Sequence, residues 1–436
     1  MSKNTYDTII VGGGVSGLEI GALLAHDGRR VLVLEKSKTA CGRARLWKKD
    51  GFTVDYGIHL IRFGPESAMS KICRRLGREI RYKPLGPSYV YDGDGHIKLF
   101  PTGPAGFLRS EMFGLFERLK ALATMIKIKL GRFNGLQEVS VRDWMRQNGI
   151  DGSLARYFTM VSASMMVCPF IERSSAGEML ANISKVLSTG YSVMYPAGGW
   201  GPLFDLFEKT IRAGGEIRLG AKVDRVIMEN GKAVGVSCGG REIRGRSVIL
   251  CVPVQEIFDG LLDEKNFPDE VVAACRSLRP TAGVVLDYGL RTKICDDSGL
   301  WYLWKPLSFG MFTSNLEPGL APEGKQLLTW LYPTGVEDMK DPETAKKREH
   351  EIEEALFNTF PGLERNVEWR RAMRLRMVDG VEVNVRQYRE KRVGPCLTGA
   401  QNLYLAGDAT AADGAGGDVA QQSVLECYRA VTGRSL

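Results

Sequence analysis

Three glycines near the amino end have the spacing of a phosphate-binding turn. The run Gly12-Gly13-Gly14-Val15-Ser16-Gly17 reads G-x-G-x-x-G, follows a β-branched segment at residues 8–11 and precedes apolar residues at helical spacing. Gly12 allows a tight turn, Gly14 lets the backbone approach a pyrophosphate, and Gly17 lets the helix pack close to the strand. The free N–H groups at the start of the helix attract phosphate. The sequence therefore predicts a dinucleotide site here.

An acidic residue stands where a dinucleotide site needs one. A second strand is expected over residues 31–34 and ends at Glu35, which follows Gly17 by 18 residues. A carboxylate at this place can accept a hydrogen bond from a ribose hydroxyl. The order strand, glycine turn, helix, strand and acid predicts a Rossmann-like α/β unit.

The stretch after the second strand indicates which dinucleotide binds, FAD or NAD, because it resembles a known motif. Gly42-Arg43, followed by Asp55-x-Gly57, resembles the second FAD motif of the flavin amine oxidase and phytoene desaturase superfamily. Cys41 stands where that motif usually has a further glycine, a replacement that is tolerated if the residue adopts φ below zero. We interpret Cys41 as a small packing residue rather than a reactive thiol. The resemblance implies that the cofactor is FAD, bound non-covalently.

The carboxy-terminal segment resembles a further FAD motif of the same superfamily. A strand over residues 403–406 leads into Gly407-Asp408, and a glycine-rich loop precedes a helix expected to begin near Asp418. The resemblance implies that Asp408 contacts ribityl or phosphate oxygens. It also implies that the helix start, at Asp418 and Val419, faces flavin N1 and the C2 carbonyl, where negative charge develops on reduction. From its residue type alone, Asp418 is expected to be a helix N-cap.

A middle segment completes the expected FAD site. Residues 221–226 resemble the strand that returns the chain to the FAD domain, and the resemblance puts the backbone of Val223 against the adenine. A role for Val223 in the strand core alone is the alternative. The residues expected to bind FAD are Gly12, Gly14, Val15, Ser16, Gly17, Glu35, Lys36, Gly42, Arg43, Gly57, Ile58, Val223, Gly407, Asp408, Asp418 and Val419.

One histidine follows the second motif directly. His59 is one of four histidines in the chain and lies in the apolar run at residues 54–62. Because the motif ends at Gly57, the resemblance implies that the next residues pass beside the flavin. We therefore predict His59 and Arg62 as catalytic candidates, with His59 as a proton donor, a proton acceptor or a hydrogen-bond partner of the substrate. A purely structural role for His59 is the alternative.

The chain divides into two kinds of segment around these motifs. Residues 1–83, 190–278 and 367–436 are predicted to form an FAD-binding domain that is glutathione reductase-like and of the amine oxidase type. Residues 84–189 and 279–366 lack the glycine-rich and parallel patterns and are predicted to form one discontinuous α+β substrate-binding domain. Within these two insertions we expect helix caps at Ser140 and near Ser175, strands at 283–290, 300–304 and 326–332, and a charged helix at 343–360.

Composition excludes several classes of protein. With 436 residues, 44% hydrophobic and 25% charged, the chain suits a folded protein of roughly two domains. The net charge of +8 is dispersed, so nucleic acid is not an expected partner. The nine cysteines lie singly and lack metal-site spacing, so no metal site is expected. We predict a cytoplasmic protein, because no apolar run has membrane-spanning length and the first strand begins too early to follow a cleaved leader.

A basic and apolar segment leaves two interpretations open. Large apolar residues over 113–130 alternate with Arg118, Lys120, Lys127 and Lys129, and Arg132 follows. Such a helix could dip into a membrane interface and make the protein membrane-associated. Alternatively, it packs on the substrate domain with its basic side chains extended over apolar surface, which is the interpretation we favour.

The resemblance predicts an FAD-dependent oxidoreductase. Hydride would move between flavin N5 and a hydrophobic small-molecule substrate, isoprenoid or carotenoid-like, with desaturation or saturation of a carbon–carbon bond. The alternatives are an amine oxidase or protoporphyrinogen oxidase-like oxidase, an isomerase that uses reduced FAD, and a non-catalytic prenyl-lipid carrier. The electron acceptor stays open among oxygen, a quinone and a nicotinamide.

Two further groups of residues could contact the substrate. Trp301, Tyr302, Trp304 and Phe309 could line its pocket, although ordinary core positions are the favoured interpretation for any one of them. Arginines between residues 365 and 376 could hold an anionic head group, or form a solvated charged face, which we favour.

Overall fold

The glycine turn lies in a five-stranded parallel sheet. The computed structural model describes residues 5–57, 60–93, 95–133 and 135–436. The strand order is β10-β2-β1-β14-β20, with every neighbouring pair parallel. The strands are β1 (Thr8–Val11), β2 (Val31–Glu35), β10 (Gly215–Leu219), β14 (Val248–Leu250) and β20 (Leu403–Leu405). The three central strands are uninterrupted buried runs, as strands covered on both faces require.

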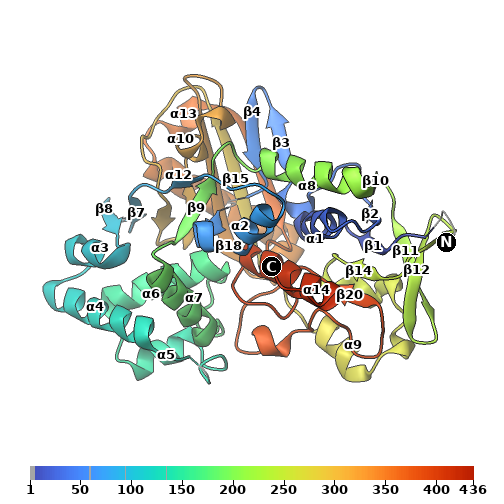
Figure 1. The fold of residues 1–436 in the computed structure, drawn as a ribbon. Helices are drawn as coiled ribbons and strands as arrows, with labels where there is room; N and C mark the ends of the chain where they lie inside the picture. Colours follow the sequence, from blue (N-terminus) through green and yellow to red (C-terminus); the bar gives the residue numbers. More distant parts are fainter. Residues whose placement is uncertain (1–4, 58–59, 94, 134) are drawn as a thin grey trace.

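Helices from three parts of the chain pack beside this sheet. They are α1 (Val15–His26), α8 (Gly201–Gly214) and α14 (Gly417–Thr432). Helix α1 contacts both of the others and lies between them (Figure 1). Residues 16–25 of α1 are all buried, so this helix is part of the core. The sequence motifs at both ends of the chain thus meet in one Rossmann-like α/β unit, which confirms the predicted fold class.

Small antiparallel sheets flank this unit. β3 (Leu46–Lys49) pairs with β4 (Phe52–Asp55), while a second sheet has the order β11-β12-β13. The turns Asp50-Gly51 and Asn230-Gly231 have positive φ at both residues, the geometry that two-residue hairpins with these sequences adopt. The strands of the second sheet are β11 (Val223–Glu229), β12 (Lys232–Cys238) and β13 (Arg241–Arg244).

The two predicted insertions contribute to one seven-stranded sheet. Its order is β19-β15-β18-β17-β16-β7-β8, and β16 of the second insertion pairs in parallel with β7 of the first. β19 begins at residue 367, where we predicted the return to the FAD domain, yet it pairs with β15 and so lies in this sheet. The strands are β7 (Ser88–Tyr91), β8 (Ile97–Phe100), β15 (Ala282–Leu290), β16 (Trp301–Leu303), β17 (Ser308–Met311), β18 (Gln326–Thr334) and β19 (Val367–Leu375).

The two faces of this sheet belong to different apolar clusters. Trp301 packs in one cluster with Ile352 and Leu356 of α12 (Pro342–Thr359), whereas Tyr302 belongs to the main core. The alternation follows from the two-residue period of a strand. The predicted strands and the predicted charged helix are confirmed, with their ends shifted by a residue or two. Shorter helices complete the chain: α2 (Ala68–Arg75), α9 (Asp269–Arg276), α10 (Thr313–Leu316), α11 (Val336–Lys340) and α13 (Leu363–Asn366).

Helices α3 to α7 form a lobe at one end of the molecule (Figure 1). Their bounds are α3 (Gly103–Arg109), α4 (Leu115–Leu130), α5 (Val141–Gln147), α6 (Gly152–Met166) and α7 (Ala176–Thr189). The hydroxyl oxygens of Ser140 and Ser175 accept hydrogen bonds from the third residues of α5 and α7, so both predicted caps are confirmed. Within the ranges described above, no helix has the length and apolar character needed to span a bilayer.

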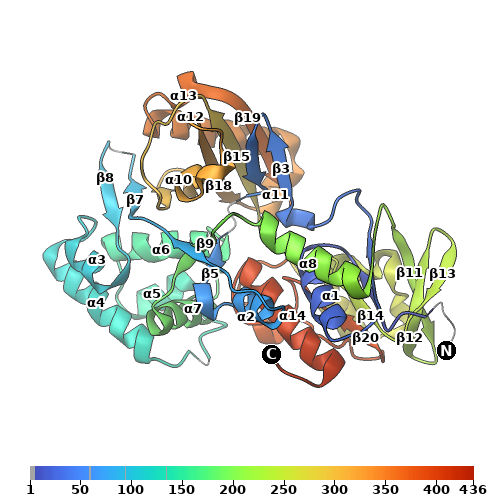
Figure 2. The ribbon, with the colours of Figure 1, turned by 45° about the horizontal axis from the view of Figure 1, so that its top comes forward.

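A three-stranded sheet lies where this lobe meets the rest of the chain. Its order is β5-β9-β6, with β5 (Ile61–Arg62), β6 (Tyr82–Pro84) and β9 (Val193–Pro196). Figure 2 shows β5 and β9 between the helical lobe and α14. This position brings Arg62 close to the start of α14.

Candidate functional site

The glycine turn is tightly constrained on one side and open on the other. Gly12 has φ 105°, and an added Cβ there would collide with the carbonyl oxygen of Cys251. A Cβ on Gly17 would collide with the carbonyl oxygen of Gly12. In contrast, no atom of the described chain lies within 4 Å of a Cβ added to Gly14, the N-cap of α1. The turn therefore leaves free space in front of the helix start, where a phosphate would bind.

Glu35 faces this turn from the end of β2. One carboxylate oxygen accepts a hydrogen bond from the backbone N–H of Gly13 at 2.7 Å, and the other accepts one from the N–H of Ser37 at 2.7 Å. The carbonyl oxygen of Glu35 accepts from the N–H of Ala221 at 2.8 Å, which brings the start of β11, with Val223, beside the acid. Residues expected at the ribose and the adenine are therefore neighbours, and Lys36 is exposed next to them.

The second motif packs directly against the first. The N–H of Cys41 donates to the carbonyl oxygen of Gly13 at 2.8 Å, and a Cβ on Gly42 would lie 3.2 Å from the Cα of Gly14. Cys41 has φ 72°, so the condition under which a non-glycine residue is easily tolerated here, a φ below zero, is not met. This left-handed conformation explains why glycine suits the position. Burial raises the pKa of the Cys41 thiol to about 12, which fits a packing residue and not a reactive thiol.

The second and carboxy-terminal motifs are joined by an ion pair. Arg43 Nη2 lies 2.7 Å from Asp408 Oδ1, and Asp408 Oδ2 accepts from the N–H of Gly380 at 2.6 Å. Burial acts to raise the pKa of Asp408, but the Arg43 guanidinium and the backbone N–H donors together outweigh burial, and the net pKa is lowered. Asp408 is therefore a carboxylate held in place. A Cβ on the adjacent Gly407 would meet no atom of the described chain within 4 Å.

The start of α14 differs from the sequence prediction. Gly416, with φ 60°, is the N-cap, and Asp418 is the second residue of the helix, so the prediction of Asp418 as the cap is wrong. The residue is 7% exposed, and its Oδ2 atom has no hydrogen-bond partner among the described residues. Burial raises the pKa of Asp418 to about 6, although the charges of Lys185 and Arg62 oppose the shift. Val419 is fully buried behind it.

Arg62 extends from β5 toward this helix start. Its Nη2 atom donates to the carbonyl oxygen of Met165 in α6, whereas its buried Nη1 atom has no hydrogen-bond partner in the described part of the chain. Burial lowers the pKa of Arg62, and the groups that oppose this shift are Asp418, Asp379 and the Tyr302 hydroxyl. One guanidinium thus faces two acids and a phenol from three separate parts of the chain.

Asp379 is a site residue that the sequence analysis missed. Its Oδ2 atom is buried without a hydrogen-bond partner in the described ranges, and it would lie 3.4 Å from a Cβ added to Gly416. Burial and the nearby Asp408 raise the pKa of Asp379 to about 6, while Arg43 and Arg62 oppose the shift. The pair Asp379-Gly380 was the only local signal in the sequence, and only the folded chain places it beside α14.

These observations fit an elongated cofactor with a charged end and a planar end. Added Cβ atoms meet no described atom at Gly14, Gly57, Gly407 and Gly417, so the three motifs border open space. Buried polar atoms without partners lie at the α14 end of this space, on Arg62, Asp379 and Asp418. Buried polar atoms ordinarily have hydrogen-bond partners, and the polar edge of a flavin ring would supply partners here. Ile58 and His59 lie outside the described residues, so the prediction for His59 stays a prediction.

Aromatic side chains of the helical lobe and the seven-stranded sheet lie next to Arg62. Tyr302 stacks on Phe100 with ring centroids 4.4 Å apart, and Phe100 stacks on Tyr157 at 5.1 Å. Burial raises the pKa of Tyr302 to about 12, so the phenol is neutral. Trp301 points to the opposite face, where its ring lies 5.0 Å from that of Phe360. Of the predicted pocket aromatics, Tyr302 and its neighbour Phe309 are on the Arg62 side, and Trp301 is not.

The arginines of β19 have partners within the protein. Arg370 and Arg374 both pair with Glu349 of α12, at 2.6 Å and 2.7 Å. Arg371 pairs at 2.8 Å with Asp287, whose side chain is fully buried. These pairs argue against both predicted roles, because the guanidinium groups are neither free for an anionic head group nor simply solvated.

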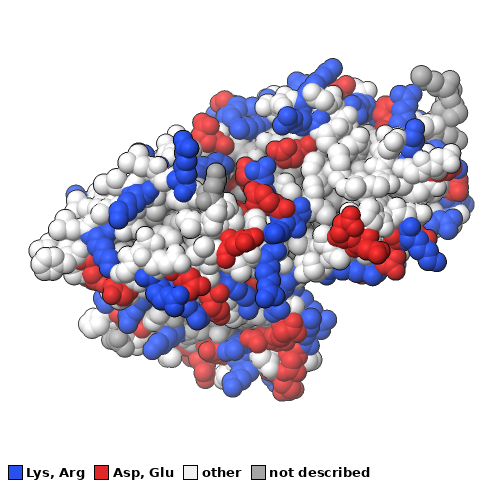
Figure 3. Space-filling view, turned by 90° about the horizontal axis from the view of Figure 1, so that it is seen from below, with Lys and Arg blue, Asp and Glu red and all other residues white. Residues whose placement is uncertain are grey.

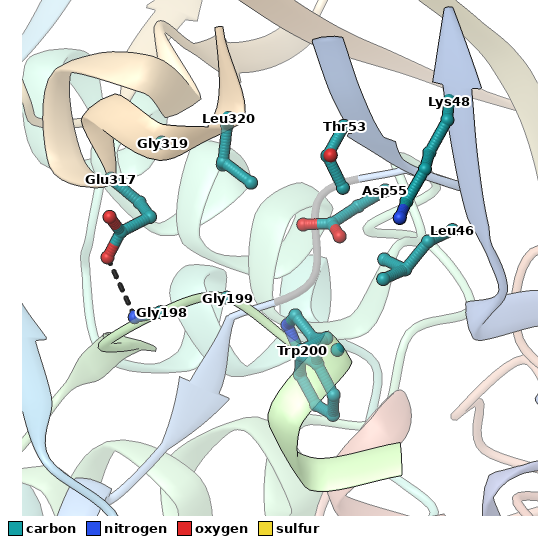
Figure 4. A pocket seen from close by; sticks show the side chains of 11 residues that line it. Leu46, Lys48, Thr53, Asp55, Gly198, Gly199, Trp200, Glu317, Gly319 and Leu320 are labelled. Atoms are coloured by element: carbon teal, nitrogen blue, oxygen red, sulfur yellow. Dashed lines mark hydrogen bonds between the residues drawn. The ribbon is translucent and has the colours of Figure 1, made fainter. Parts of the chain in front are cut away.

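A small pocket of about 290 Å³ lies apart from the glycine turn. It is bordered by the β3–β4 hairpin, the start of α8 and the turn at residues 317–320 (Figure 4). Glu317 accepts from the N–H of Gly198 at 2.7 Å on one side, and Asp55 lies on the other. Burial raises the pKa of Asp55 to about 7, although a hydrogen bond from Tyr195 at 2.9 Å opposes the shift. Among the described residues, no group of His, Cys, Asp and Glu could hold a metal ion.

Comparison with known proteins agrees with this geometry. Residues 15–429 match the family model described as flavin containing amine oxidoreductase. A chloroplastic prolycopene isomerase from Daucus carota is 26% identical over 420 residues, which cover 83% of this chain and 68% of that protein. A 4,4'-diapophytoene desaturase from Methylomonas sp is 27% identical over 278 residues, or 57% of this chain and 53% of that protein. The crystal structure of an oxidoreductase from Methanosarcina mazei, 21% identical, matches with a TM-score of 0.79 over 96% of this chain and 98% of that chain.

Proposed function

The chain belongs to the flavin-containing amine oxidoreductases, and on this premise we propose that its FAD-dependent chemistry acts on a carbon–carbon bond of a hydrophobic, polyene-like substrate. The reaction is desaturation or its reverse, saturation. FAD supplies a two-electron carrier that exchanges hydride with the substrate at N5. The remaining tasks belong to the residues of this chain.

The first task is to bind and orient the cofactor. The N–H groups at the start of α1, in front of Gly14, suit the pyrophosphate, and Glu35 suits a ribose hydroxyl. The ion pair of Arg43 and Asp408 holds the second and the carboxy-terminal motifs together. The start of α14 carries the positive end of a helix dipole, which favours negative charge on a flavin ring beside it.

The second task is to hold an apolar substrate. The stacked rings of Phe100, Tyr157 and Tyr302 carry this part of the proposal, because they form a buried apolar cluster that includes a neutral phenol and reaches Arg62 through Tyr302. Relatives named for reactions on prolycopene and 4,4'-diapophytoene, which are polyene hydrocarbons, support the same substrate class. At this end, Arg62, Asp379 and Asp418 carry buried polar atoms without a partner among the described residues, and the two acids could hold or move a proton there.

Redox-neutral isomerisation is the second candidate function. It is favoured by the prolycopene isomerase, which matches 83% of this chain. The same residues would serve, because an isomerase and a desaturase both need a flavin beside an apolar substrate. The two reactions differ in whether electrons leave the substrate.

Product analysis with defined flavin states separates these functions. Holoenzyme is incubated with polyenes of different saturation and geometry, once with oxidised flavin and an added quinone and once anaerobically with reduced flavin. Desaturation predicts a product with one more double bond only in the first mixture, whereas isomerisation predicts an altered geometry only in the second. Unchanged polyenes in both mixtures, together with turnover of amines, would contradict the proposal.

A further inference from the structure

The outer face of α4 is apolar although it faces solvent. Six of the ten large apolar side chains that are exposed among the described residues lie between positions 108 and 130. Phe116 is 85% exposed and Leu130 is 79% exposed, and the others are Leu108, Leu115, Leu119 and Ile126. Monomeric proteins expose single apolar residues commonly but clusters of this kind rarely. The cluster therefore indicates an interaction surface.

Helical geometry gathers these residues into one stripe. At 3.6 residues per turn, Leu115, Leu119, Ile126 and Leu130 fall within an arc of about 60°, and Phe116 extends it to about 100°. The opposite side of the helix is also apolar, because Ala121, Met125 and Ile128 are buried against the lobe. The prediction that α4 packs on the substrate domain thus describes only its inner face. Its outer face is a second apolar stripe, which we call the α4 stripe.

Basic side chains border the α4 stripe on both sides. By the same geometry, Lys120 and Lys127 lie along one edge, and Lys129 and Arg118 lie along the other. Residues 108–132 contain six basic and only two acidic side chains. Figure 3 shows the end of the molecule that carries α4 as a broad uncharged area with Lys and Arg across it.

The acid within α4 is turned toward the protein. The Glu117 carboxylate accepts hydrogen bonds from the N–H groups of Gly114 and Ser153, each at 3.1 Å. Arg118 donates to the carbonyl oxygen of Leu108 at 2.9 Å, a contact that positions the guanidinium without neutralising it. Lys120 forms an exposed ion pair with Asp151 at 3.6 Å, so the positive charge around the stripe comes mainly from Arg118, Lys127 and Lys129.

We propose that the α4 stripe docks this protein on an anionic lipid bilayer, with α4 lying flat in the interface. Apolar side chains would enter the acyl boundary while the bordering lysines contact acidic head groups. A second copy of the chain is a poorer occupant, because a two-fold contact through this face would place each basic border against another basic surface. Charge complementarity thus selects an anionic lipid surface.

The position of α4 suits delivery of an apolar molecule. α4 packs on α6 and α7, and α6 provides the Met165 carbonyl that holds Arg62. The docking face therefore lies on the lobe that also supplies Tyr157 to the stacked rings of Phe100 and Tyr302. The docking itself does not depend on which reaction the protein catalyses.

Vesicle flotation with the FAD-loaded protein tests the proposal. We expect binding to vesicles of phosphatidylcholine with phosphatidylglycerol and much weaker binding to phosphatidylcholine alone. The triple variant Phe116→Ser, Leu119→Ser and Leu130→Ser should bind vesicles about tenfold more weakly or worse, because each apolar side chain that enters the bilayer contributes to the binding free energy. The double change Lys127→Glu and Lys129→Glu should remove the preference for anionic vesicles.

A matched control separates docking from folding. Leu219, 41% exposed on β10, lies far along the chain from the α4 stripe, and Leu219→Ser should leave partitioning unchanged. FAD content and melting temperature should be the same in all variants. Wild-type protein that stays with the soluble fraction, or a triple variant that floats as well as the wild type, would overturn the proposal. Lipid-free self-association that the triple variant abolishes would also overturn it, in favour of a second copy.

Discussion

Replacing Gly14 with alanine tests the phosphate-binding turn directly. Gly14 is the N-cap of α1 with φ −69°, a conformation that alanine adopts without strain. A methyl group there meets no atom of the described chain within 4 Å, so it would project into the space in front of the helix start. We expect Gly14→Ala to preserve the fold and to weaken FAD binding.

The expected magnitudes differ between fold and cofactor. Alanine is a poorer N-cap than glycine by about 1 kcal/mol, so the melting temperature of the FAD-free protein should fall by only a few degrees. Displacing a phosphate from one helix N–H group loses a charged hydrogen bond of about 1.5 to 3 kcal/mol. That loss corresponds to a rise of about ten- to a hundredfold in the Kd for FAD.

Quenching of FAD fluorescence on titration with protein measures the Kd, and thermal unfolding measures the fold. Gly114→Ala is the matched control, because Gly114 is the N-cap of α4 with φ −65° and an added Cβ would lie 3.8 Å from its nearest neighbour, Glu117. The control should have the same small loss of stability and an unchanged Kd. A Gly14→Ala protein that binds FAD as tightly as the wild type would refute the assignment of this turn.

Three other predictions address the opposite end of the site and the sheet behind it. Arg62→Ala should retain FAD but lower the flavin reduction potential, because it removes a positive charge beside the ring. A shift of about 30 mV, measured against reference dyes, corresponds to a tenfold change in the equilibrium constant for two-electron reduction. An unchanged potential would show that Arg62 does not act on the flavin. The folded-state pKa of Asp379, about 6, lies above the ordinary 3.8, so its contribution to stability is complete below about pH 4 and is lost as pH rises through about 6. In the FAD-free wild type, this acid should lower the free energy of unfolding by up to about 3 kcal/mol as the pH rises from 4 to 7. Asp379→Asn should remove that decline from the pH profile measured by urea unfolding. A variant with the same pH profile as the wild type would contradict the prediction. Arg371→Met should cost about 3 to 5 kcal/mol in urea unfolding because it leaves Asp287 buried without its cation. Arg370→Met should cost only about 1 kcal/mol, because the Arg370 side chain is 33% exposed and that of Glu349 is 12% exposed; equal losses would contradict this difference.

Local signals in the sequence were sufficient for the parallel unit and the helix caps. The glycine turn, its flanking strands and Glu35 are close in sequence, and their geometry depends on backbone rules that each residue type obeys. Ser140 and Ser175 cap helices for the same reason, since a cap is a contact over three residues. The FAD contacts assigned through the resemblance are consistent with this arrangement and stay predictions for the individual residues.

Contacts between distant segments could not be predicted in the same way. Asp379 reaches α14 because β19 pairs with β15, and nothing near residue 379 encodes that pairing. The Arg371–Asp287 pair depends on the same register, so the arginine cluster looked like a charged surface. The exposure of the α4 stripe could not be predicted either, because the sequence of a helix that is apolar on two sides does not show which side the fold will cover.

Anaerobic mixing of the oxidised holoenzyme with partly saturated polyenes is the most direct test of the proposed chemistry. Stopped-flow spectroscopy would follow the visible absorbance of the flavin, and product extraction would count the double bonds. We predict that the flavin is reduced in step with the gain of one double bond per bound FAD. A flavin that stays oxidised with every polyene, while amines reduce it, would contradict the account.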